Sequence, residues 1–105
     1  MDLSVKQLAQ VTALVSKMTP EEKVGQMILV DPRFLDTPSD ISTFNIGGVF
    51  VNGGGAPPPN TTESWISLAK TMQHHAGESS MKIPLLLGTD AVHGHNNLYG
   101  SVLFP

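Results

Sequence analysis

Residues 83–97 read IPLLLGTDAVHGHNN. A short apolar segment, Ile83–Leu87, gives way to one carboxylate, two imidazoles and two carboxamides. In α/β proteins a buried parallel strand commonly ends in such a loop, because functional groups gather at the carboxyl edge of the sheet. This stretch therefore predicts a parallel α/β fold with a functional site just beyond its strand.

The rest of the chain predicts two further strands and several helices. Helical spacing of apolar residues, helix caps and glycine or proline stops define the helices. The predicted strands are Met27–Asp31, Gly47–Asn52 and Pro84–Leu87. The first of them is expected to be buried and to end at Pro32. The first two predicted helices are Ser4–Ser16 and Pro20–Gly25, the second capped by Thr19 with Glu22, and a short helix is predicted within Asp36–Asn45. A further helix is predicted to begin at a cap formed by Asn60 with Glu63 and to end at Gly77. Its apolar stripe consists of Trp65, Leu68, Ala69, Met72 and Ala76.

This alternation of strands and helices predicts parallel βαβ units within a single domain over residues 1–105. Three parallel strands suit either a small doubly wound domain or the first part of a (β/α)8 TIM-type barrel, which needs about 250 residues. The apolar run Tyr99–Pro105, with no helix after it, favours an incomplete barrel. Its open sheet edges are expected to promote self-association.

Composition excludes several classes of function. The net charge of −3, without a block of Lys or Arg, gives no electrostatic footprint for nucleic acid. No apolar run reaches the roughly 20 residues of a membrane-spanning helix. The chain has no cysteine, so disulfides and thiolate metal sites are absent. The amino terminus lacks a signal-peptide pattern, and the compartment stays unknown.

Asp90 is the leading candidate for ligand binding. It directly follows the last predicted strand. One interpretation is a carboxylate that caps backbone amides of the loop. The other is a carboxylate held at the sheet edge to accept hydrogen bonds from a ligand, each contributing roughly 1.5–3 kcal/mol. Two adjacent sugar hydroxyls would suit its two oxygens. Asp31 ends the first predicted strand and could share the same edge.

The two histidines of the loop, His93 and His95, have an H-x-H spacing that some metallohydrolases use for a divalent metal. They lie several residues beyond the strand, which favours a scaffold role with Asn96 and its neighbour through hydrogen bonds to the loop backbone. The metal alternative would use His93, His95 and Asp90.

Two other polar or flexible segments receive structural interpretations. The pair His74-His75 is expected on a solvated helix end. The run Gly53-Gly54-Gly55 lacks the following Lys-Ser/Thr of a phosphate cradle, so it predicts close approach of a ligand or neighbouring strand.

With these residues in place, the chain resembles the amino-terminal domain of glycoside hydrolase family 3. The matching segments, in the family's order, are Lys17–Met27 (KMTPEEKVGQM), Ile46–Val49 (IGGV), Gly53–Gly55 (GGG), Ile83–Asn97 and the final Phe104-Pro105. The form DAVHGHNN at residues 90–97 is similar to the β-glucosidase and exo-β-glucan glucohydrolase branch.

The resemblance implies a (β/α)8 barrel and retaining, exo-acting hydrolysis of β-D-glucosides or β-glucans without a cofactor. It implies that Asp90 binds hydroxyls of the terminal glucose and that His93, His95 and Asn96 are loop scaffold. Retaining hydrolysis needs two carboxyl groups roughly 5–5.5 Å apart. In the family both come from later sequence, so we expect no catalytic residue in this chain and no activity from it alone. The alternatives are the metal-dependent hydrolase and a non-catalytic sugar-binding remnant.

Overall fold

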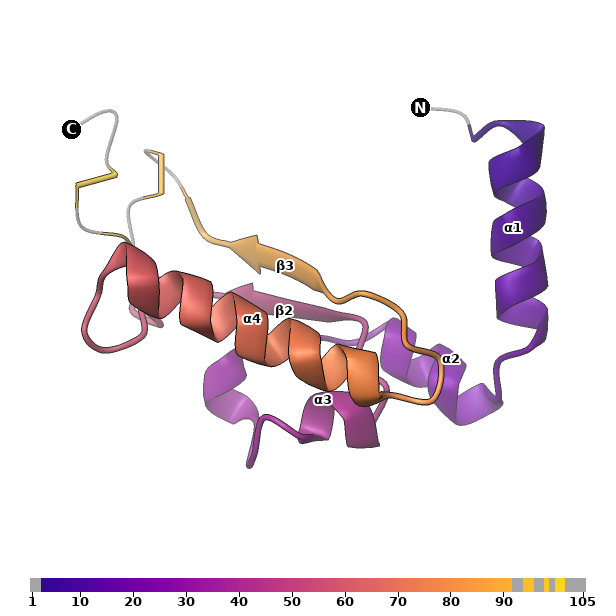
Figure 1. Cartoon of the computed structure of the whole chain (residues 1–105), viewed down its shortest axis with the longest axis horizontal. Coiled ribbons are helices and arrows are strands. Elements are labelled where there is room, and N and C mark those ends of the chain that lie inside the picture. The colour runs from indigo at the N-terminus through magenta and orange to yellow at the C-terminus, as the bar shows by residue number, and fades with distance from the viewer. Residues whose placement is uncertain (1–2, 92–93, 96–97, 99, 102–105) are drawn as a thin grey trace.

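The chain forms an α/β unit with one three-stranded parallel sheet, in strand order β1-β2-β3 (Figure 1). The structure is a computed structural model, which describes residues 3–91, 94–95, 98 and 100–101. In chain order the elements are α1 (Val5–Ser16), α2 (Pro20–Gln26), β1 (Leu29–Val30), the 3-10 helix η1 (Pro32–Phe34), α3 (Asp40–Thr43), β2 (Gly48–Val51), α4 (Thr62–Glu78) and β3 (Leu86–Thr89). The α/β class with three parallel strands is therefore confirmed.

The first two helices begin where local sequence predicts. The Ser4 side chain accepts a hydrogen bond from the Gln7 amide, and the Gln7 side chain reaches back to the Ser4 amide. Thr19 and Glu22 make the same reciprocal pair at the start of α2, as predicted. No residue of α1 is buried, and Figure 1 shows this helix apart from the sheet.

The predicted ends of α4 are wrong, by one residue at its start and by two at its end. Thr61 is the N-cap, and its hydroxyl accepts a hydrogen bond from the Ser64 amide. Asn60 is not the cap, because its side-chain oxygen accepts the indole N–H of Trp65 at 2.9 Å. The helix also continues past Gly77, and the extended residue Ser79 ends it with both its amide and its hydroxyl on the Ala76 carbonyl.

The first two strands are shorter than predicted, and the third keeps its predicted length but is displaced along the chain. The amides of Met27 and Ile28 close the end of α2, so β1 begins only at Leu29. The backbone of Leu85 bonds both ways to the Gln73 side chain of α4, and β3 therefore begins at Leu86 and extends to Thr89.

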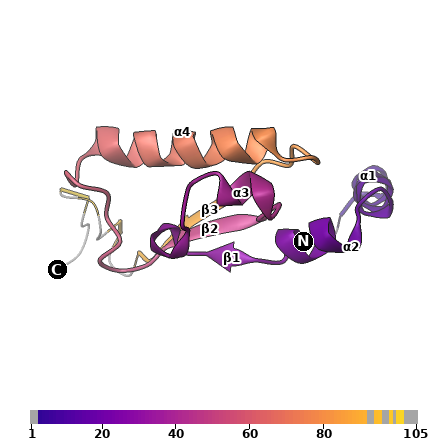
Figure 2. The same ribbon diagram turned by 90° about the horizontal axis from the view of Figure 1, so that it is seen from below.

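The hydrophobic core lies on one side of the sheet. Figure 2 shows α3 and α4 on the same side of the strands. Side chains from both helices, from β2 and from the segments entering β2 and β3 fill the space between them. The buried members are Ile41, Ile46, Val49, Val51, Met72, Ala76 and Leu85. The apolar stripe predicted for α4 is confirmed, because Trp65 and Leu68 also pack against this cluster.

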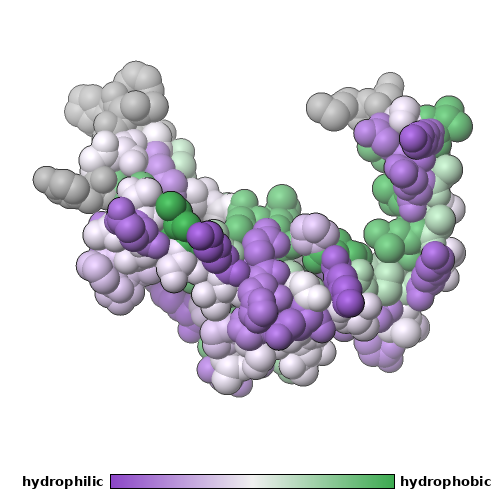
Figure 3. Space-filling model, viewed as in Figure 1, coloured by the Kyte–Doolittle hydropathy of each residue, from purple (hydrophilic) through white to green (hydrophobic). Residues whose placement is uncertain are grey.

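The opposite face of the sheet is apolar and exposed. Leu29 is 56% exposed and Leu86 is 70% exposed, so the expectation of a buried first strand is wrong for this structure. Side chains alternate along a strand, and no described helix covers this second face (Figure 2). Figure 3 shows hydrophobic surface along the sheet and on α1. None of the described helices combines the length and apolarity needed to cross a membrane.

Candidate functional site

The carboxyl ends of all three strands meet at one edge of the sheet. Asp31 follows β1, Asn52 follows β2 and Asp90 follows β3. The register pairs Val51 with Thr89, and continuing it by one residue brings Asn52 beside Asp90. The Asp90 amide donates to the Val51 carbonyl at 3.1 Å, which maintains strand pairing up to Asp90. Asp31 and Asp90 thus share one edge, as the sequence suggested they could, whereas Asn52 was not predicted there.

Asp31 is fixed by hydrogen bonds within the chain. One carboxylate oxygen accepts the amide and Nε of Arg33, both at 3.0 Å, and the other accepts Arg33 Nη2 at 2.8 Å. The second oxygen also accepts the Asn52 amide at 3.2 Å and its Nδ2 at 3.1 Å. The side-chain hydrogen bonds from Arg33 hold the pKa of the Asp31 carboxyl well below its usual range. The charged Asp31 side chain therefore links the ends of β1 and β2 through hydrogen bonds.

The partners of Asp31 were not predicted from the sequence. Asp31 is the N-cap of η1, with Pro32 in the first turn. An aspartate before a proline is a common helix-start pattern, which could have predicted the contact to the Arg33 amide. Asn52 lies 21 residues away, and no local pattern indicates its bonds to Asp31.

Asp90 is exposed at the same edge. A methyl group added at Gly53 would lie 3.9 Å from its Oδ2 atom, so the glycine loop after β2 runs close to this carboxylate. That distance is an ordinary van der Waals contact; the closer approach to the glycine run is at Gly55, where a Cβ would lie 3.3 Å from Arg33 Nε, beyond the end of the neighbouring strand β1. The alternation along β3 places Asp90 on the side of Gly88, opposite the helix-covered face.

His95 contacts α4 through its ring. The imidazole and the Trp65 indole make an edge contact, with ring centroids 4.6 Å apart and planes at 79°. The imidazole Nδ1 is buried and has no hydrogen-bond partner among the described residues. The described contact of this ring is therefore aromatic, and the scaffold role predicted for His95, through hydrogen bonds to the loop backbone, stays a prediction. His93 and Asn96 lie outside the described residues.

Other histidines and candidate metal ligands lie elsewhere. His74 and His75 lie 3.4 and 2.9 Å from Glu78 near the end of α4. The His74 side chain is 70% exposed, as expected for a solvated helix end, whereas the His75 side chain is only 22% exposed. Within residues 3–91 and the described positions after them, no three His, Asp or Glu side chains come together as a metal site requires. The metal alternative also needs His93, which is outside that set.

Comparison with known proteins agrees with this arrangement. The family model described as the glycosyl hydrolase family 3 N terminal domain matches residues 19–105. A lysosomal beta glucosidase from Dictyostelium discoideum is 35% identical over 109 aligned positions, which cover 88% of this chain. The chain belongs to glycoside hydrolase family 3. The match spans 13% of the length of that relative.

Proposed function

We propose that this chain forms the first part of a β-glucosidase-type (β/α)8 barrel and supplies one wall of its glucose site. The observation that carries the proposal is the position of Asp90, an exposed carboxylate at the carboxyl end of β3 within the family-matched segment. Active sites of (β/α)8 barrels lie at this end of the strands. In the proposed site, the two Asp90 oxygens accept hydrogen bonds from two neighbouring hydroxyls of a terminal glucose.

The exposed sheet face supports the barrel. Leu29, Gly48 and Leu86 are aligned across the three strands, and Phe50 is aligned with Gly88 in the next row. A Cβ at Gly48 would lie 2.6 Å from Leu29 Cδ1, and one at Gly88 would lie 2.7 Å from Phe50 Cδ2. Large side chains thus fill the spaces above glycines of neighbouring strands. The interior of a barrel is packed in such layers.

The proposed role of this chain is binding rather than bond cleavage. Retaining hydrolysis uses a nucleophilic carboxylate and an acid/base carboxyl roughly 5–5.5 Å apart. Asp31 is the other carboxylate that directly follows a strand at this edge among the described residues, and its two oxygens accept hydrogen bonds from Arg33 and Asn52. Its lowered pKa also makes it unsuited to donate a proton near neutral pH. We therefore assign the reacting carboxyls to sequence outside this chain, with exo-acting cleavage of β-glucosides by the complete enzyme.

The 105-residue protein is accordingly expected to have no β-glucosidase activity. Purified chain would be incubated with an aryl β-glucoside, and release of the aryl alcohol would be followed against a boiled sample. Turnover that copurifies with the folded chain and is lost in Asp31→Asn or Asp90→Asn would contradict the assignment of the chemistry to other sequence.

The glucose-binding role of Asp90 is tested by a charge-removing substitution. Asp90→Asn keeps the shape of the side chain and removes its charge, so glucose affinity should fall roughly 10- to 100-fold, the equivalent of one or two charge-assisted hydrogen bonds. Saturation-transfer NMR, which detects weak sugar binding, would be used to titrate glucose into both proteins. Asp36→Asn is the matched control, since Asp36 is an exposed aspartate in the loop before α3.

The control distinguishes the outcomes. Loss of binding in Asp90→Asn but not in Asp36→Asn is the expected result. Equal glucose affinity in all three proteins would show that Asp90 does not bind glucose. If the unchanged chain does not bind glucose at all, the proposal that these residues form part of a glucose site by themselves is contradicted.

A further inference from the structure

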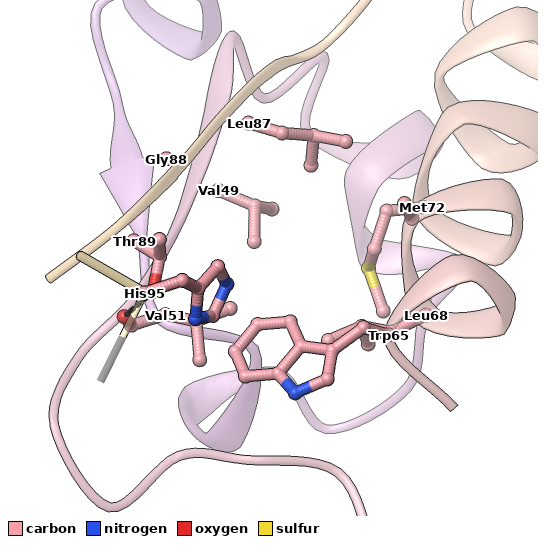
Figure 4. A pocket seen from close by; sticks show the side chains of 10 residues that line it. Val49, Val51, Trp65, Leu68, Met72, Leu87, Gly88, Thr89 and His95 are labelled. Atoms are coloured by element: carbon pink, nitrogen blue, oxygen red, sulfur yellow. Dashed lines mark hydrogen bonds between the residues drawn. The ribbon is translucent and has the colours of Figure 1, made fainter. Parts of the chain in front are cut away.

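A separate pocket of about 170 Å³ lies between the sheet and α4. Its sheet side is made by Val49, Val51 and Leu87, and its helix side by Leu68 and Met72 of α4 (Figure 4). This is the helix-covered face, whereas strand alternation places Asp90 on the other face. The pocket is therefore distinct from the proposed glucose site and does not depend on it.

One polar atom in this apolar pocket is available to a ligand. The His95 ring lines the pocket beside Trp65, and its buried Nδ1 has no hydrogen-bond partner among the described residues (Figure 4). The other polar groups of the lining are engaged: the Thr89 hydroxyl donates to the Val51 carbonyl at 3.1 Å, and the Trp65 indole N–H donates to Asn60. An unpaired buried acceptor is costly, so a ligand that donates to Nδ1 gains a specific bond.

The lining determines which ligand fits. Apolar cavities of roughly 150 Å³ are large enough for benzene, whereas an ordered water needs two to four polar partners. A monosaccharide would bury several hydroxyls against a single acceptor, which is unfavourable. An aromatic ring would instead meet the Trp65 indole and the Met72 thioether, both of which attract ring edges or faces.

We propose that this pocket binds a small neutral aromatic alcohol of phenol size, whose ring lies against Trp65 and Met72 and whose hydroxyl donates to His95 Nδ1. The tautomer with its proton on Nε2 leaves Nδ1 as the acceptor.

The test compares phenol with toluene, which has similar size and no hydroxyl. Trp65 is the chain's one tryptophan, so its fluorescence reports the pocket directly. Both compounds would be titrated in the same mildly alkaline buffer. Excitation at the long-wavelength side of the indole band avoids ligand absorption, and free N-acetyltryptophanamide corrects for collisional quenching. Phenol should bind saturably and about tenfold more tightly than toluene, the equivalent of one net hydrogen bond.

Two variants separate the hydrogen bond from the cavity. His95→Phe keeps an aromatic ring beside Trp65 and should remove the phenol preference while toluene still binds. Ala69→Leu adds apolar volume from α4 and should abolish binding of both compounds. Equal affinities for phenol and toluene in the unchanged chain, phenol binding that survives Ala69→Leu, or no saturable change would each overturn the proposal. The phenol–toluene comparison and Ala69→Leu remain decisive if His95→Phe does not fold.

Discussion

Replacing Gly25 with alanine should destabilise the protein by about 3 kcal/mol or more. Gly25 is buried in α2, and its carbonyl accepts the Gly47 amide at 2.9 Å. A Cβ at this position would collide with the Phe44 carbonyl oxygen and would lie 2.6 Å from that of Asn45. Both obstacles are backbone atoms at the entrance to β2, which cannot rotate away as a side chain can. Overpacking commonly costs 1–3 kcal/mol, and a backbone collision lies at or above the top of that range.

Gly77 provides the matched control, because it is also a helical glycine. A Cβ there would have no neighbouring atom within 4 Å, so Gly77→Ala should stabilise the protein by about 0.5–1 kcal/mol through helix propensity alone. Urea unfolding followed by Trp65 fluorescence would measure both variants. A Gly25→Ala protein within 1 kcal/mol of the unchanged chain would show that α2 is not packed against the Phe44–Asn45 backbone, since the propensity gain of alanine over glycine is itself no more than about 1 kcal/mol.

The contrast between these glycines illustrates what the sequence could predict. Both read as breaks in apolar helical patterns, and Gly77 was predicted to stop α4, although the helix continues to Glu78. The tight contact at Gly25 depends on residues about 20 positions away, so local patterns do not indicate it. By comparison, the Thr19–Glu22 cap is formed within three residues and was predicted correctly.

Burial was less predictable than the type of each element. The apolar composition of the first strand gave the correct class, because β1 is a parallel strand at the edge of the sheet. Its exposure depends on what covers the second face of the sheet, and this is a property of the whole fold. The ends of α4 were misplaced for a related reason, since the Asn60 side chain is engaged by the Trp65 indole and Thr61 takes the capping position.

The position of Asp90 at the sheet edge was predictable from the sequence, whereas the contacts around it were not, and its glucose-binding role stays a prediction. The change from apolar to polar residues at the end of the last strand indicated Asp90 from sequence alone, and its sheet-edge position agrees. The bonds from Asn52 to Asp31 and the contact of His95 with Trp65 join residues 21 and 30 positions apart. Such contacts follow from strand register and from packing of α4, which local spacing does not specify.

Asp31→Asn should destabilise the protein by about 2–4 kcal/mol at neutral pH. The substitution places an amide NH₂ among five N–H donors from Arg33 and Asn52, so at least one hydrogen bond is lost and the Arg33 charge loses its partner. Charge-assisted hydrogen bonds contribute roughly 1.5–3 kcal/mol each, and breaking a buried ion pair costs up to about 5 kcal/mol. The half-exposed Arg33 side chain can regain water, which reduces the loss. Asp36→Asn, an exposed control, should change stability by less than about 0.5 kcal/mol.

The pH dependence of this loss identifies the charge as its cause. The pKa of Asp31 is lowered in the folded chain, chiefly by the Arg33 side-chain hydrogen bonds, so the unfolded chain takes up a proton first as the pH falls. The stabilisation is therefore fully present above the unfolded carboxyl value of about 4 and declines as the pH falls below it toward the folded pKa. Urea unfolding of both proteins at about pH 7 and about pH 3 should show a smaller difference at the lower pH. A difference that is the same at both values would mean that the shape of the carboxylate, rather than its charge, joins β1 to β2.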